Sequence, residues 1–127
     1  MALTVSLPTF NEGLNSDTFQ CKAVNDGSAA AAQIQIGFAP RYILVLNLTD
    51  GIRDEYTPNT TAGTSWHTIA NGTVTVAAAN GITVLPPGTA NAAALATGSP
   101  LPVLAGGFVL GTGVLLASKT YDIFAQR

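Results

Sequence analysis

The chain has 127 residues and one cysteine, so it is long enough for a single domain with a real core but cannot form an intrachain disulfide. Only 9% of its residues are charged, against about 25% in average proteins, and its net charge is −2. The five basic residues are scattered, which argues against direct nucleic-acid binding. A surface with so little charge favours a partner that covers much of it, over a neutral soluble domain.

The start of the sequence lacks a charged segment followed by an apolar core and a cleavage site, which a signal peptide would have. The apolar runs are also far shorter than the roughly 20 residues that span a bilayer. We therefore expect synthesis in the cytoplasm and no membrane partner.

Residues 1–10 alternate in character, with Leu3, Val5 and Leu7 on one side and polar residues between them, until Pro8 ends the pattern. This period of two predicts a strand. It is either an edge strand of the domain or an extended N-terminal arm that adds to the sheet of a neighbouring subunit. Open sheet edges allow the second arrangement, because they offer unpaired N–H and C=O groups.

The next segments also indicate strands. Thr18–Val24 is a weak candidate, and Gln33–Ile36 alternates strictly, which predicts that both isoleucines lie on one face and both glutamines on the other. The apolar run Tyr42–Leu48 follows, and Asp50-Gly51 marks a turn because glycine accepts the positive φ that such turns require.

The second half continues with short strands between Asx-Gly turns. The predicted strands are Ile52–Tyr56, Ser65–Ala70, Thr73–Val76, Ile82–Leu85, Phe108–Leu110 and Tyr121–Ala125. This pattern predicts an all-β fold, either an antiparallel β-sandwich or a jelly-roll-like barrel, in a single domain over residues 1–127.

Residues 86–107 (PPGTANAAALATGSPLPVLAGG) form a long Pro/Ala-rich loop without a charged side chain. A loop of this length in a compact domain is usually functional or disordered. We expect it to extend over a neighbouring subunit; the alternative is a surface loop without a partner.

Metal-binding and cofactor-binding patterns are weak. One histidine and one cysteine, far apart in the sequence, argue against zinc. Asp50, Asp54 and Glu55 are the candidate calcium ligands, but they lack an EF-hand pattern and suit solvated hairpin residues. No Gly-rich phosphate loop lies between a strand and a helix. The sequence therefore predicts neither a metal nor a cofactor.

Catalytic patterns are equally weak. His67 is the only imidazole, and a triad would have to recruit Ser65 or Ser118 with Asp50 or Asp122. No recognised local signature frames either serine, and no spacing selects a pair of acids for glycoside cleavage. We interpret His67 as an ordinary strand residue and expect that the chain is not an enzyme.

Trp66 is the single tryptophan of the chain. Tryptophan side chains often anchor interfaces, and they also stack on sugar rings. A position in the core is nevertheless the interpretation that the sequence favours.

The stretch GFAPRYILVLNLTDG, residues 37–51, resembles the G-F-x-P-R-Y-V-x-V-x-N-L-T-D signature of a group of small virion proteins of tailed bacteriophages. The group comprises capsid decoration (cement) proteins and closely related head and tail appendage proteins. The resemblance covers roughly residue 33 to the C-terminus, with gaps, and continues at SWHTI (65–69), AANGITVLP (78–86), GFVLGT (107–112) and YDIFA (121–125).

The resemblance implies a structural virion protein that binds the outer surface of the phage head and stabilises it. The implied partners are the major capsid protein and further copies of the chain, with a trimer favoured over a dimer. The protein would be made in the cytoplasm of the host bacterium. The alternative is a fibre, baseplate or other appendage module that binds host glycans, and a cell-wall hydrolase is the weakest option. The candidate contacts with other subunits or the capsid are Leu3, Val5, Leu7, Leu95, Leu101, Val103 and Leu104.

Overall fold

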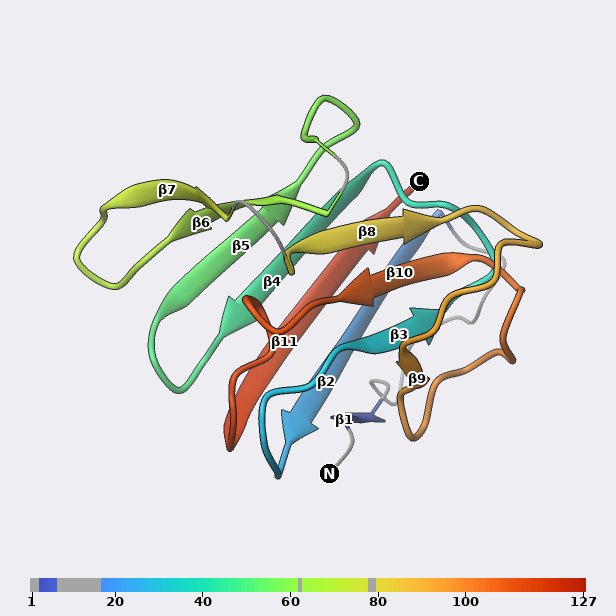
Figure 1. Ribbon diagram of the computed structural model, residues 1–127, viewed down its shortest axis with the longest axis horizontal. Helices are drawn as coiled ribbons and strands as arrows, with labels where there is room; N and C mark the ends of the chain where they lie inside the picture. The colour runs from blue at the N-terminus through green and yellow to red at the C-terminus, as the bar shows by residue number, and fades with distance from the viewer. Residues whose placement is uncertain (1–2, 7–16, 62, 78–79) are drawn as a thin grey trace.

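The computed structural model describes residues 3–6, 17–61, 63–77 and 80–127 (Figure 1). In this part of the chain there are strands and no helix, so the predicted all-β class is confirmed. The strands are β1 Leu3–Ser6, β2 Thr18–Asn25, β3 Ala32–Gln35, β4 Tyr42–Asn47, β5 Ile52–Tyr56, β6 Ser65–Thr68, β7 Val74–Ala77, β8 Ile82–Leu85, β9 Ala94–Leu95, β10 Gly107–Leu110 and β11 Lys119–Gln126.

The strands form two sheets. The large sheet has the order β1-β2-β11-β4-β5-β6-β7, and the small sheet has the order β8-β10-β3-β9. Every pairing is antiparallel except that of β3 with β9. The described strands therefore divide into two separate sheets and do not form a closed barrel.

The small sheet lies in front of β2, β11 and β4, whereas β5, β6 and β7 extend beyond it on the left of Figure 1. The core lies between the sheets because alternate residues of each strand point inward. In β2, for example, Phe19, Cys21 and Ala23 are buried while the residues between them are exposed. They share one apolar cluster with side chains of the small sheet, including Ile34 and Phe108.

Strand β3 is buried on both faces. All four of its residues are buried, including the polar Gln33 and Gln35. Residues of the 86–107 loop contact the amides: Gln33 Nε2 donates to the Ala93 carbonyl at 2.7 Å, and Gln35 Oε1 accepts from the Gly106 N–H at 2.8 Å. The loop is therefore attached to β3 of the same chain at Ala93 and near its C-terminal end at Gly106.

The middle of the loop joins the two sheets. Strand β9 pairs with β3 of the small sheet, and Thr97 forms a bridge with Thr4 of β1 in the large sheet. The Thr97 carbonyl accepts from the Val5 N–H at 2.7 Å, and the Thr97 N–H donates to the Leu3 carbonyl at 2.9 Å. The outer edge of β1 is thus paired with the same chain.

Candidate functional site

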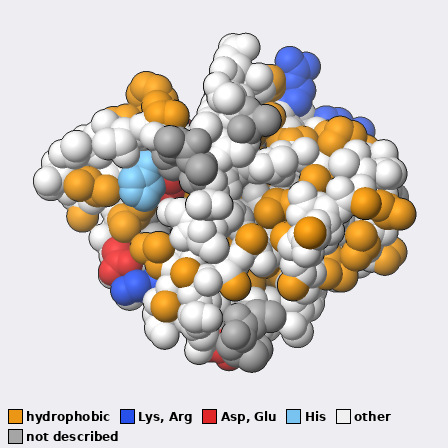
Figure 2. All heavy atoms as spheres, in the orientation of Figure 1, with side chains coloured by type: hydrophobic (Ala, Val, Ile, Leu, Met, Phe, Trp, Pro, Cys, Tyr) orange, Lys and Arg blue, Asp and Glu red, His pale blue; other side chains and the backbone are white. Residues whose placement is uncertain are grey.

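Apolar side chains of the 86–107 loop gather at one end of the molecule, on the right of Figure 2. Leu95, Val103 and Leu104 are 36%, 43% and 47% exposed, and Leu101 is half-buried. We refer to these four residues as the loop patch. Four of the seven candidate contact residues therefore lie on one loop and are accessible to a partner at least in part.

Leu104 has an unusual backbone conformation, with φ +77°. Left-handed backbone is uncommon for residues other than glycine, asparagine and aspartate, and for a leucine it costs on the order of 1–3 kcal/mol. The conformation is supported by the Leu104 carbonyl, which accepts a hydrogen bond from the Gly88 N–H at 2.8 Å. The strained backbone holds an apolar side chain toward solvent, and such a combination points to a functional position.

The N-terminal candidates lie elsewhere. Leu3 and Val5 are buried in the core cluster, and their strand pairs with β2 on one side and Thr97 on the other. Their side chains are therefore not on a surface that another subunit could contact, which corrects the contact role expected for them. The other interpretation of this segment, an edge strand of the domain, agrees with β1, which is the first strand in the order of the large sheet. Leu7 lies outside the described residues.

A polar cluster lies on the face of β5 and β6 that continues the core side of the large sheet. Asp54 of β5 is directly opposite His67 of β6 in the strand register. Its Oδ1 accepts a hydrogen bond from Ser65 Oγ at 2.9 Å and lies 2.7 Å from His67 Nδ1. Asp54 is buried, whereas the His67 side chain is 20% exposed. Burial raises the pKa of the Asp54 carboxyl, and the hydrogen bonds from His67 and Ser65 oppose that shift.

The arrangement differs from a nucleophile–base–acid relay. Ser65 Oγ donates to the Asp54 carboxylate and not to the His67 imidazole, so the imidazole is not placed to take its proton as in a Ser-His-Asp triad. The acids considered from sequence are elsewhere, because Asp50 pairs with Lys119 and Asp122 accepts from Gln20. The cluster therefore links β5 to β6 through a buried carboxylate.

Sequence reasoning missed Asp54 as the partner of His67. Alternation places Ser65 and His67 on one face of β6, and that much was available from the sequence. Their partner on β5 depends on the register, which the intervening loop of residues 57–64 does not fix.

The three acids considered as calcium ligands do not converge. Asp50 pairs with Lys119 at 3.1 Å, Glu55 with Arg53 at 3.1 Å, and Asp54 with the two polar residues of β6. Within the described ranges, no three His, Cys, Asp or Glu side chains gather closely enough to bind a metal ion together.

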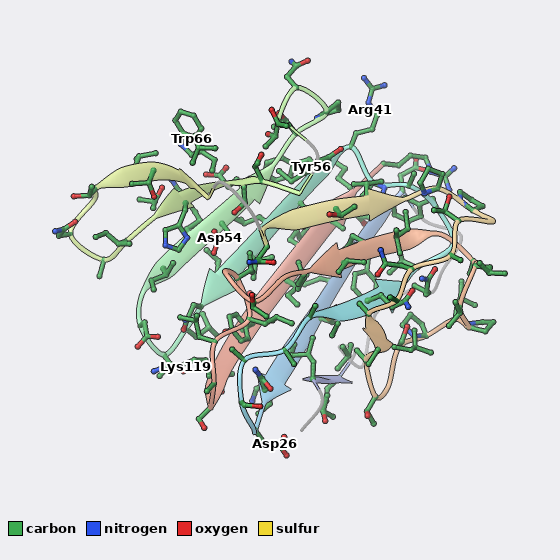
Figure 3. The ribbon with its side chains drawn as sticks, viewed as in Figure 1. Asp26, Arg41, Asp54, Tyr56, Trp66 and Lys119 are labelled. Carbon is green, nitrogen blue, oxygen red and sulfur yellow. The ribbon has the colours of Figure 1, made fainter. Side chains whose placement is uncertain are left out.

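Trp66 lies on the opposite face of β6 and points away from Asp54 (Figure 3). Its side chain is 52% exposed, so the favoured core position is wrong. It borders a groove of about 340 Å³ whose other lining residues are Thr57, Asn59, Thr60, Thr61, Thr64 and Val76. The groove lies on the outer face of β6 and β7, opposite to the face that carries Asp54 and His67.

None of the described segments forms a helix that could span a membrane. No family model, curated protein or solved structure matches this chain.

Proposed function

We propose that this chain is a structural protein of a bacteriophage virion, a capsid decoration (cement) protein that binds the outer surface of the head. The sequence signature of residues 37–51 suggests this class. The observation that carries the proposal is the loop patch, an uncharged apolar surface attached to a two-sheet body at Ala93, Thr97 and Gly106. We further propose that the two sheets form a β-sandwich, with jelly-roll connectivity as the finer assignment.

The proposed mechanism is mass action on the assembled shell. A protein that binds the lattice but not free capsid subunits stabilises the lattice by its binding free energy. Burying one exposed leucine or valine side chain contributes about 1.5–3 kcal/mol before the cost of association. Because many copies bind one shell, modest contributions per copy add up over the head.

The sparse charges of the chain suit a contact of this kind. Lys119 pairs with Asp50, and Arg53 pairs with Glu55, so these four charges have partners within the chain. The 86–107 loop contributes no charge, and an apolar contact through it leaves no unpaired ion buried. The net charge of −2 favours the outer surface of the head over the DNA-facing one.

We also propose that the protein forms a homo-oligomer, with a trimer favoured over a dimer. Parts of the loop patch then contact neighbouring copies, and the rest contacts the major capsid protein. Sedimentation velocity of the isolated protein separates monomer, dimer and trimer, and a monomer at every concentration would refute the oligomer.

The test of the proposal uses heads assembled without this chain, to which purified protein is added. Leu104→Asn removes the apolar side chain, and asparagine accepts left-handed backbone more readily than leucine. We expect affinity for heads to fall about tenfold or more while stability is kept or raised. Leu48→Asn is the matched control, because Leu48 is also exposed but lies in the turn after β4.

Equal loss of head binding in both variants would show that the loop patch has no special role, and no binding of the unchanged protein would refute decoration. The alternative function is a fibre, baseplate or other appendage module. It predicts few copies per particle instead of a copy number close to that of the capsid protein.

A further inference from the structure

We propose that the groove beside Trp66 is a binding site for a neutral carbohydrate. The site is separate from the loop patch, and the inference does not depend on capsid attachment.

The indole of Trp66 forms an exposed apolar platform. Val76 lies directly opposite Trp66 in the pairing of β6 with β7, so the two side chains are cross-strand neighbours on one face. Both are more than half exposed. An exposed tryptophan beside an exposed valine at the rim of a groove is the apolar part of a ligand site rather than part of the fold.

The opposite wall is a turn held by its own hydrogen bonds. The Thr60 N–H donates to the Thr57 carbonyl at 2.9 Å, and the Thr57 N–H donates to Thr60 Oγ1 at 3.2 Å. Pro58 follows Thr57 and fixes φ at the second position of this turn. The hydroxyl and amide groups of the wall are therefore positioned before a ligand arrives, which lowers the entropic cost of binding.

The polar groups of the wall retain unused capacity for hydrogen bonds. The Thr57 and Thr60 hydroxyls bond to each other at 3.3 Å, and each keeps a further donor or acceptor position. The Asn59 side-chain amide lies at the exposed apex of the turn and has no hydrogen-bond partner among the residues that the structure describes. Asn59 thus offers both a donor and an acceptor to a ligand.

These groups match the chemistry of a sugar ring. A pyranose presents an apolar face of C–H groups, which packs on an indole, and hydroxyls at its rim, which bond to threonine and asparagine side chains. Five of the seven lining residues are threonine or asparagine, and none is charged. A phosphate or carboxylate would find no cationic partner, and nucleic acid would find no charge for its backbone. The volume of about 340 Å³ is at the lower end of ligand pockets, about 300–1,000 Å³, and suits one or two sugar units.

The test uses the isolated 127-residue chain, because Trp66 is its single tryptophan and reports directly on the groove. Neutral oligosaccharides of glucose, galactose and N-acetylglucosamine are titrated in turn, and an array of neutral and acidic glycans widens the search. We expect a saturable change in Trp66 emission with at least one neutral glycan. A preference for acidic glycans, or no saturable change with any neutral glycan, would overturn the proposal.

Variants separate stacking from a general effect, with binding measured by calorimetry. Trp66→Ala is expected to abolish binding, Trp66→Phe to retain part of it, and Asn59→Ala to weaken it about twofold to tenfold. Val74→Thr is the control, because Val74 is an exposed residue of β7 outside the groove. Unchanged binding by Trp66→Ala would overturn the proposal. So would sugar-free self-association that Trp66→Ala removes, since the groove would then be an interface between copies.

Discussion

The side-chain amide of Gln35 donates a hydrogen bond to the side-chain carbonyl of Gln33, and both side chains are buried. Gln33 in turn donates to the Ala93 carbonyl, and Gln35 accepts from the Gly106 N–H. The two amides therefore connect Ala93 and Gly106 of the 86–107 loop through β3. Since this loop carries the loop patch, the glutamine pair determines where that surface lies on the molecule.

The first prediction concerns this pair. Gln35→Leu keeps a similar volume but leaves Gln33 Oε1 and the Gly106 N–H without partners, and each buried orphan group costs about 1–3 kcal/mol. We expect the free energy of unfolding in urea to fall by about 2–4 kcal/mol and the Gly106 amide to exchange hydrogen faster. Gln126→Leu, at an exposed residue of β11, is the control and should change stability little. Equal stability of the two variants would refute the role of the pair.

The second prediction concerns the contact of the loop with β1. Gly98 has φ +85°, and a Cβ at this position would collide with the Val5 carbonyl oxygen. Gly88 has a similar φ of +87° but open space around it. Gly98→Ala should therefore destabilise the protein by about 1–3 kcal/mol more than Gly88→Ala, because only the former adds a collision to the conformational cost. Thermal unfolding of the two variants measures the difference, and equal melting temperatures would contradict the contact.

The third prediction concerns pH. Burial raises the pKa of Asp54 above its ordinary value of 3.8. At a pH between 3.8 and the raised pKa of the folded state, the folded protein therefore binds more protons than the unfolded chain. This carboxyl therefore contributes stability that is fully present below about pH 3.8 and is lost as the pH rises through its folded pKa. The free energy of unfolding is measured in urea as the pH is raised from 3.8 through the folded pKa of Asp54. It should decrease in the wild type and not in Asp54→Asn.

The control for that experiment is Asp26→Asn, at an exposed aspartate after β2. It should keep the slope of the wild type. If Asp54→Asn also kept the slope, the pH dependence would arise from another group.

The fourth prediction concerns Cys21, which lies in the core on β2. Burial raises the pKa of its thiol to about 12, with a smaller contribution from the Asp122 carboxylate. Almost no thiolate exists at neutral pH, and a chromogenic disulfide reagent should react only when the protein unfolds. Ala29→Cys adds an exposed thiol as a control, and one of its two thiols should react at once. Prompt reaction of the wild-type thiol would contradict the packing of β2.

Local patterns in the sequence were sufficient to predict the class of the fold. Thr18–Val24 alternates weakly in composition, yet its residues alternate between core and solvent as a strand requires, and β2 extends only one residue further. The all-β prediction held because period-two patterns and Asx-Gly turns act over a few residues. Local patterns did not reveal that Gln33 and Gln35 are buried, since the loop residues that contact them are about 60–70 residues away in the sequence.

The candidate sites also differ in whether local sequence patterns were sufficient to predict them. Val103 and Leu104 are exposed as a contact surface requires, because the loop that carries them is attached by its other residues. Leu3 and Val5 were misjudged because an alternating edge strand has the same sequence whether its apolar side packs on its own core or on a neighbour. Trp66 was placed in the core because the sequence does not reveal which face of β6 points toward the core side of the large sheet; that face carries Ser65 and His67, and Trp66 lies on the other.

The central claim is that the chain decorates the capsid lattice, and its copy number in purified virions tests this claim most directly. Quantitative mass spectrometry against the major capsid protein gives the ratio. The account predicts a ratio near one to one. A few copies to a few dozen per particle would instead indicate a vertex, fibre or tail position, and absence from the particle would contradict a virion role altogether.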